Sequence, residues 1–161
     1  MRGKLWGMQE TIPSRDDSTL PGRIKALGQV LGFSAIGIAD AEVSEAVPHL
    51  QQWLAQHFHG EMDYMARHAH LRADPQGMLP GTRSVIMAVL DYLPETHLHP
   101  TPGNPTISRY ALGRDYHGIM RRRLQKLAQA MRDEIGPFGY RVFSDSAPVM
   151  EVHFASQAGL G

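Results

Sequence analysis

Apolar residues recur at helical spacing in the second half of the chain. After Asp115 they follow one another at steps of three or four residues, at Tyr116, Met120, Leu124, Leu127, Met131 and Ile135. This spacing places all six on one face of a helix, and Gly136-Pro137 is typical of a helix end. The pattern therefore predicts a long amphipathic helix directly after Asp115.

Shorter helices are predicted elsewhere by the same reasoning. Pro21 opens one that carries apolar residues on a single face and ends at Gly32. We predict further helices from Pro48 toward His59-Gly60, over residues 61–68 and over residues 149–158. Turn residues predict loops at 71–82 and 94–106.

Continuous apolar segments predict the strands. Residues 34–38 (SAIGI) and 84–90 (SVIMAVL) are short and apolar, and residues 140–143 are similar. Because 84–90 is apolar almost throughout, we expect that strand to be central. Residues 108–112 are expected to be extended. The alternation predicts an α+β (mixed α/β) fold with a small central sheet flanked by helices, as one domain over residues 21–161 after a flexible leader at 1–20.

Composition narrows the function classes. The 161 residues carry 16 Lys and Arg against 16 Asp and Glu, so an overall basic field for nucleic acid is absent. There is no cysteine, which excludes thiolate zinc sites and iron–sulfur ligation by these residues. No segment is as apolar as the ~20 residues that span a bilayer, and we expect a cytoplasmic protein.

The histidines and a run of arginines could each have a function, but each also has a simpler structural interpretation. Nine histidines include three His-x-His pairs at 57/59, 68/70 and 97/99, but no acidic residue completes a metal site at a suitable spacing. The run Arg121–Arg123, with Lys126 and Arg132, could contact phosphates. Solvated loop histidines and a solvated helix face are the favoured interpretations.

Asp145 stands between a predicted strand and a predicted helix. A carboxyl at the end of a strand lies where ligands bind in open sheets, and partial desolvation there would let it donate a proton near neutral pH. The alternative is that Asp145 caps the helix that follows. From these residues alone the cap is favoured.

Three ordered motifs resemble a known family. They are HGEMDYM from His59 with Arg72 and Leu79-Pro80-Gly81, then RYALGRDYH from Arg109, then VFSDSAPVME from Val142. The final AGLG matches a point at which that family continues. From about Leu20 onward the chain resembles the N-terminal part of epoxyqueuosine reductase.

The resemblance implies a specific chemistry. Family members carry cobalamin and two [4Fe–4S] clusters, and they reduce epoxyqueuosine at the tRNA wobble position to queuosine, the last step of queuosine biosynthesis. By position, Asp145 matches the family's proton donor. Arg72, Ser108, Asp145 and Met150 fall where family members contact the corrinoid. A full-length member is expected to be a monomer.

The chain departs from the family pattern in having no cluster-binding cysteine. We therefore expect a cobalamin-binding N-terminal domain truncated before the iron–sulfur domain, and one that is inactive alone. Two alternatives remain: a non-enzymatic corrinoid-binding carrier module, and a small RNA-binding domain that uses the Arg121–Arg123 helix.

Overall fold

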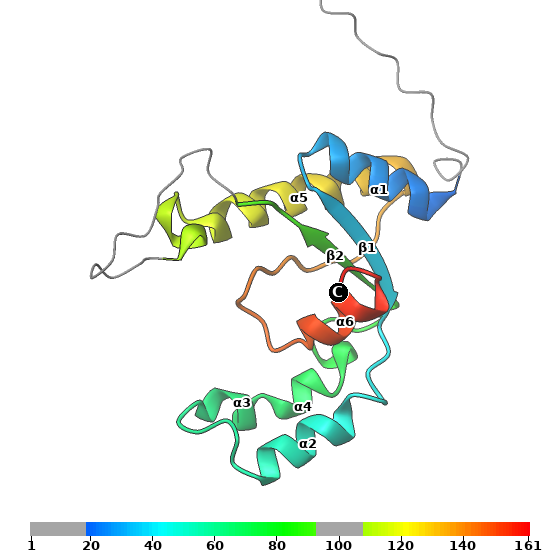
Figure 1. The fold of residues 1–161 in the computed structure, drawn as a ribbon. Helices are drawn as coiled ribbons and strands as arrows, with labels where there is room; N and C mark the ends of the chain where they lie inside the picture. The colour runs from blue at the N-terminus through cyan, green and yellow to red at the C-terminus, as the bar shows by residue number, and fades with distance from the viewer. Residues whose placement is uncertain (1–18, 93–107) are drawn as a thin grey trace, which may run out of the picture.

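A computed structural model describes residues 19–92 and 108–161 (Figure 1). The predicted loop 94–106 and nearly all of the predicted leader lie outside these residues. In chain order the elements are α1 (Leu20–Val30), β1 (Ala35–Asp40), α2 (Val47–Ala55), α3 (Asp63–Arg67), α4 (Ala69–Arg72), the 3-10 helix η2 (Pro75–Gly77), β2 (Ser84–Val89), the 3-10 helix η3 (Arg109–Leu112), α5 (Tyr116–Ile135) and α6 (Glu151–Gln157). This mixture confirms the predicted α+β class.

The sheet is a pair of antiparallel strands. β1 and β2 pair from Ala35 opposite Val89 to Asp40 opposite Ser84. On one face, side chains of both strands join α1 and α5 in a cluster built around Ile36 and Leu127. On the other face, they surround Phe154 of α6, whose side chain is fully buried. Helices on both faces explain why both strands are apolar.

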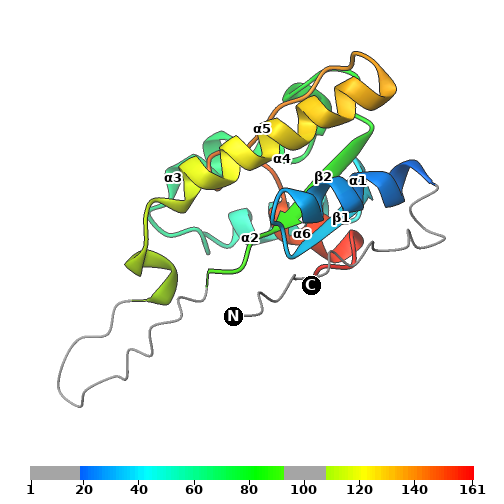
Figure 2. The ribbon, with the colours of Figure 1, turned by 90° about the horizontal axis from the view of Figure 1, so that it is seen from above.

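Figure 2 shows α1 and α5 next to one another over the sheet, and the two helices are in contact. Two glycines let helices approach β1 closely. A Cβ on Gly28 of α1 would lie 2.2 Å from Cγ1 of Ile36, and a Cβ on Gly37 would lie 2.7 Å from the carbonyl oxygen of Ala158. Any side chain at either position would push its helix off the sheet.

The long helix α5 has the boundaries that its sequence predicts. Asp115 is its N-cap and accepts a hydrogen bond from the backbone N–H of His117, which satisfies one of the free donors of the first turn. Gly136 follows the helix at φ 88°, a conformation that favours glycine. α1 is likewise capped by Thr19, and Gly32 follows it at φ 81°.

The helices α2, α3 and α4 form an arm on the far side of α6 from α1 and α5 (Figure 1). α4 contacts α2, α3 and η2, so the arm is one packed unit. α4 and η2 occupy part of the segment that was predicted as a loop. The turn residues of this segment form η2 instead. The Asp74 side chain caps this 3-10 helix by accepting a hydrogen bond from the N–H of Gln76.

Three predicted features of the sheet are wrong. Residues 140–143 form no strand, because side chains rather than a ladder hold them: Tyr140 accepts a hydrogen bond from Gln125, and Arg141 donates one to the Met78 carbonyl. Residues 109–112 form η3 rather than an extended segment. Within the described ranges β2 pairs with β1 alone, so it is not central; its apolar character comes from helices on both faces.

Candidate functional site

A cleft of about 560 Å³ lies between the arm and the segment that leads into α6. Tyr64, His68 and Arg72 line it from the arm. Arg141 and residues 145–148 line it from the opposite side. Two of the residues singled out from the sequence, Arg72 and Asp145, therefore contribute to one cleft although 73 positions separate them in the chain.

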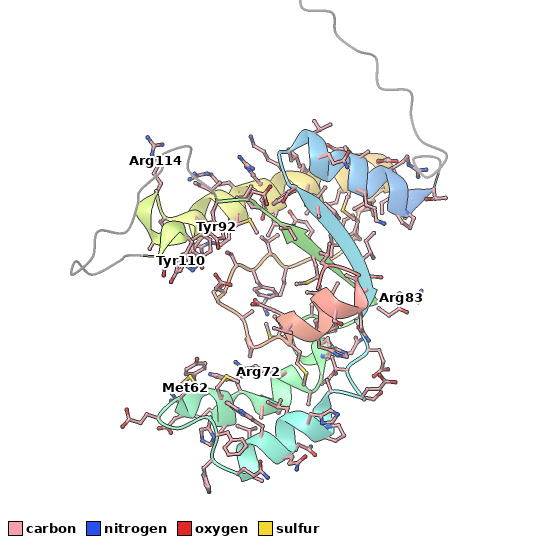
Figure 3. The ribbon with its side chains drawn as sticks, in the orientation of Figure 1. Met62, Arg72, Arg83, Tyr92, Tyr110 and Arg114 are labelled. Carbon is pink, nitrogen blue, oxygen red and sulfur yellow. The ribbon has the colours of Figure 1, made fainter. Side chains whose placement is uncertain are left out.

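Arg72 brings an unused hydrogen-bond donor to this cleft. Its Nη1 atom is buried and has no hydrogen-bond partner within the described part of the chain. Figure 3 shows the residue on the side of α4 that faces α6. Because an unpaired buried guanidinium nitrogen is costly, the atom is suited to an acceptor supplied by a ligand.

Glu151, the first residue of α6, lies near both groups. Burial of its carboxyl and the negative charge of Asp145 raise the pKa of Glu151, and the positive charge of Arg72 opposes that shift. Arg72 and Asp145, which line the cleft, thus act in opposite directions on the pKa of a neighbouring carboxyl.

Asp145 is held in an uncommon backbone conformation. Its φ is 53°, in the left-handed region that non-glycine residues seldom occupy, although Asp tolerates it better than most. The Tyr116 hydroxyl donates a hydrogen bond to Asp145 Oδ2, and Nε2 of His117 lies 3.5 Å from the same oxygen. The loop therefore directs this carboxyl toward the start of α5.

The first turn of α5 positions the groups that meet Asp145. Asp115 Oδ1, besides capping the helix, lies 2.7 Å from Nδ1 of His117. The Tyr116 and His117 rings stack with centroids 4.2 Å apart. Asp115, Tyr116 and His117 therefore form a fixed set around Asp145, and we call these four residues the acid cluster.

Hydrogen bonding within the acid cluster changes its titration. The hydrogen bond to Asp145, whose negative charge also disfavours a phenolate, raises the pKa of Tyr116 to about 12. The hydrogen bonds from the His117 side chain and backbone lower the pKa of Asp115. Near neutral pH Tyr116 is consequently a donor and Asp115 an acceptor.

The other two predicted contact residues lie apart from the cleft lining. Met150 is the residue before α6, and it packs on the cluster of Ala39, Val43 and Phe154. Ser108 is exposed and precedes η3. The structure thus brings Arg72 and Asp145 together but not Ser108 or Met150.

One expectation about Asp145 needs correction. The favoured alternative, that Asp145 caps the following helix, is wrong: the N-cap position of α6 is Met150, which makes no side-chain cap hydrogen bond. The expected partial desolvation of Asp145 corresponds to a side chain that is 49% exposed. The carboxyl is engaged by polar donors.

The histidine and arginine groups acquire local explanations. The His57 and His59 rings lie 6.0 Å apart beside Trp53, and among residues 19–92 and 108–161 no three His, Asp or Glu side chains gather as a metal site would require. The pair at 97/99 lies outside the described residues. Arg123 donates a hydrogen bond to the carbonyl of Gly32 and so connects α5 to the end of α1, while Arg121 and Arg122 are exposed.

No helix in the described ranges is long and apolar enough to span a bilayer.

Sequence reasoning missed two residues of the acid cluster. Tyr116 was assigned to the apolar face of α5, and His117 to a family motif without a role. A signal was present, because a capping Asp that is followed two positions later by His brings both side chains to the same helix end. Their meeting with Asp145 depends on the loop 136–150 and was not visible.

Fold and site together define an α+β domain with a cleft that Arg72 and Asp145 line from opposite sides. The comparisons with known proteins agree on one family. Residues 72–146 match the family model described as epoxyqueuosine reductase QueG, DUF1730. Over the segment that it covers, the chain is therefore similar to the epoxyqueuosine reductase family.

Individual relatives give the extent of the similarity. An epoxyqueuosine reductase of Pseudomonas aeruginosa is 48% identical over 158 residues, which is 96% of this chain and 44% of the relative. Those of Vibrio cholerae and Escherichia coli are each 47% identical over 150 residues, which is 91% of this chain and 41% and 40% of the relatives. The chain thus spans about two fifths of the length of these curated relatives. No solved structure matches it.

Proposed function

We propose that this chain is the cobalamin-binding segment of a tRNA-modifying epoxyqueuosine reductase, with Asp145 as its proton donor. The observation that carries the proposal is the meeting of Arg72 and Asp145 at one cleft. Both fall inside the segment that matches the family model. The two [4Fe–4S] clusters of such an enzyme would need ligands from outside these 161 residues, which contain no cysteine.

The donor chemistry of the cleft fits a corrinoid. Cobalamin carries amide groups and a phosphate at its periphery, and both accept hydrogen bonds from a guanidinium. The unpartnered Nη1 of Arg72 is such a donor. We assign Arg72 to that periphery and Asp145 to the substrate side, and we retain Met150 and Ser108 as contacts outside the cleft lining. Bound cobalamin would supply a redox metal centre that delivers electrons to the substrate.

This chain's own contribution to the reaction is to hold and deliver protons. Loss of an epoxide oxygen as an alkoxide is slow, and a positioned acid avoids that charge. Asp145 is directed by its backbone conformation and by Tyr116, and half of its side chain remains accessible to a ligand. We assign to it the proton that goes to the departing oxygen.

Cobalamin titration of the isolated chain tests the binding part of the proposal. Arg72→Met should weaken cobalamin binding by about tenfold to a hundredfold, because a hydrogen bond from a charged donor is lost. Arg83→Met is the matched control, since Arg83 is exposed at the start of β2 and does not line the cleft. Cobalamin binding is followed by absorbance spectra. Equal affinities of the two variants for cobalamin would contradict this assignment of Arg72.

The catalytic part requires a complete enzyme. A chimera that joins this segment to the remainder of the Pseudomonas aeruginosa relative would supply one, and its substrate would be tRNA carrying epoxyqueuosine. Asp145→Asn should retain cobalamin, since Asn tolerates the same backbone conformation, and should lose about 10²–10⁴-fold in turnover. Undiminished turnover would show that Asp145 is not the acid.

A further inference from the structure

The proposed reaction consumes two protons, and Asp145 holds at most one. Removing the oxygen of an epoxide breaks two C–O bonds, forms one C=C bond and releases water. Two electrons, which a low-potential one-electron donor provides through the redox cofactor, and two protons balance this change. After its first transfer Asp145 is a carboxylate and must regain a proton before the oxygen can leave as water.

The groups that face Asp145 come from two segments. Asp115, Tyr116 and His117 approach from the start of α5, and Glu151 of α6 lies close enough to Asp145 and Arg72 for both charges to affect its pKa. Tyr116 donates its only hydroxyl proton to Oδ2 and loses it only at about pH 12. Tyr116 therefore orients the carboxyl and is a poor source of protons at neutral pH.

His117 has the geometry of a source. Its Nδ1 lies 2.7 Å from the Asp115 carboxylate, so the proton on Nδ1 is held there, and its Nε2 lies 3.5 Å from Asp145 Oδ2. An imidazole nitrogen and a carboxylate oxygen that face each other hold one proton between them, on Nε2 or on Oδ2. The separation is slightly longer than a hydrogen bond, and such contacts tighten when a substrate is bound.

The ring also has a route to solvent. The His117 side chain is 40% exposed, so after releasing a proton to Asp145 it can take another from water. Histidine is the side chain whose charge changes most readily near neutral pH. The Asp115 carboxylate lies 2.7 Å from Nδ1 and fixes the ring orientation, an arrangement that recurs where His transfers protons.

We propose that His117, oriented by Asp115, reprotonates Asp145 through Nε2 and so supplies the second proton of the reaction. This inference rests on the proposed function for its substrate. The proton moves from Nε2 of the imidazolium to Oδ2 of the carboxylate, and water returns a proton to the ring. His117 acts through Asp145 and is a positioning residue.

The ring tautomers in the isolated chain test the geometry independently of any activity. Nitrogen-15 spectra above the pH at which the rings become neutral should show His117 protonated on Nδ1. His153 provides an internal control of opposite type, since its Nε2 lies 3.1 Å from the Glu42 carbonyl, an acceptor, and must donate. Asp115→Asn keeps a good N-cap for α5 but removes the carboxylate. It should remove the Nδ1 preference of His117 and leave His153 unchanged.

The chimeric reductase tests the proton transfer. His117→Gln retains a polar side chain but cannot titrate. It should keep cobalamin and the melting temperature and lose about 10²-fold or more in turnover, and the dependence of turnover on pH should change. Asp115→Asn should show a smaller loss with the same altered pH profile.

Each result has an opposite that counts against the inference. An Nε2-protonated His117 in the wild-type chain, or a tautomer that Asp115→Asn leaves unchanged, overturns the geometry. Full turnover with an unaltered pH profile in His117→Gln overturns the relay. If Asp145→Asn is fully active as well, the assignment of Asp145 as the acid is wrong; if only His117→Gln is fully active, the relay alone is wrong, so the two failures can be told apart.

Discussion

The hydrogen bond between Tyr116 and Asp145 fixes the acid cluster, and its strength can be read from the titration of the tyrosine. Asp145→Asn removes the charge but keeps the side-chain shape. The hydrogen bond that its hydroxyl donates to Asp145 is the main cause that raises the pKa of Tyr116 from its ordinary value of 10.0 to about 12. Without that carboxylate the phenolate no longer faces a negative charge, and the pKa should fall by up to about two units, a hundredfold change in the ionisation constant.

Stability at high pH should follow the same shift. A tyrosine whose pKa is raised on folding binds more protons in the native state than in the unfolded state between the two pKa values. Its contribution is therefore complete below pH 10 and is lost as the pH rises through about 12. The wild-type chain should lose stability over this interval, and Asp145→Asn should lose less.

The assay is the ultraviolet absorbance of tyrosinate, with Tyr116→Phe to identify the Tyr116 component among the five tyrosines of the chain. Urea denaturation at several alkaline pH values gives the stability. In the double variant Tyr116→Phe/Asp145→Asn, the tyrosinate absorbance of Tyr116 and its effect on the stability at high pH should both be missing. An unchanged Tyr116 titration in Asp145→Asn would refute the hydrogen bond and, with it, the geometry of the acid cluster.

Three further perturbations test the fold around the cleft. Gly28→Ala places a methyl group 2.2 Å from Cγ1 of Ile36 and should destabilise the chain by ~1 kcal/mol or more in urea denaturation. Gly118→Ala on α5 is the control: its methyl group would meet only Nη1 of Arg122, at 3.9 Å, and should stabilise the chain by about 0.5–1 kcal/mol. Equal effects of the two substitutions would contradict the close packing of α1. Phe154→Ala should cost about 3–5 kcal/mol, because the ring is only 1% exposed, and a loss below ~1 kcal/mol would mean that α6 is not docked as described. Burial and the neighbouring Asp145 raise the pKa of Glu151 in the native state. Between the unfolded-state and native-state pKa values the native state therefore binds more protons, and the stability of the chain declines as the pH rises through this range. Glu151→Gln should therefore raise the melting temperature at pH 7 but not at pH 4, and a lower melting temperature at pH 7 would show that the carboxylate is stabilising.

Local signals in the sequence determined the elements that depend on neighbouring residues. The capping Asp115, the apolar repeat and Gly136 define α5 from beginning to end, because each acts within one or two helical turns. The apolar segments that became β1 and β2 were predicted for a similar reason. Three ordered motifs were sufficient to identify the family.

Only the tertiary structure decided where these elements meet. The segment 140–143 has the composition of a strand, but contacts with α5 and with the Met78 carbonyl hold it, and no strand pairs with it in the described residues. β2 is apolar because helices cover both of its faces. A strand between two neighbouring strands would be equally apolar, so the sequence does not distinguish the two cases.

The candidate site shows the same division. Sequence named Asp145 and Arg72, yet the partners of Asp145 come from the start of α5, almost 30 residues earlier in the chain. Tyr116 has an apolar ring that suits a helix face, and its hydroxyl acquires a role only when the loop 136–150 returns to it. Long-range contacts of this kind depend on how the chain folds back on itself, which spacing along the sequence does not encode.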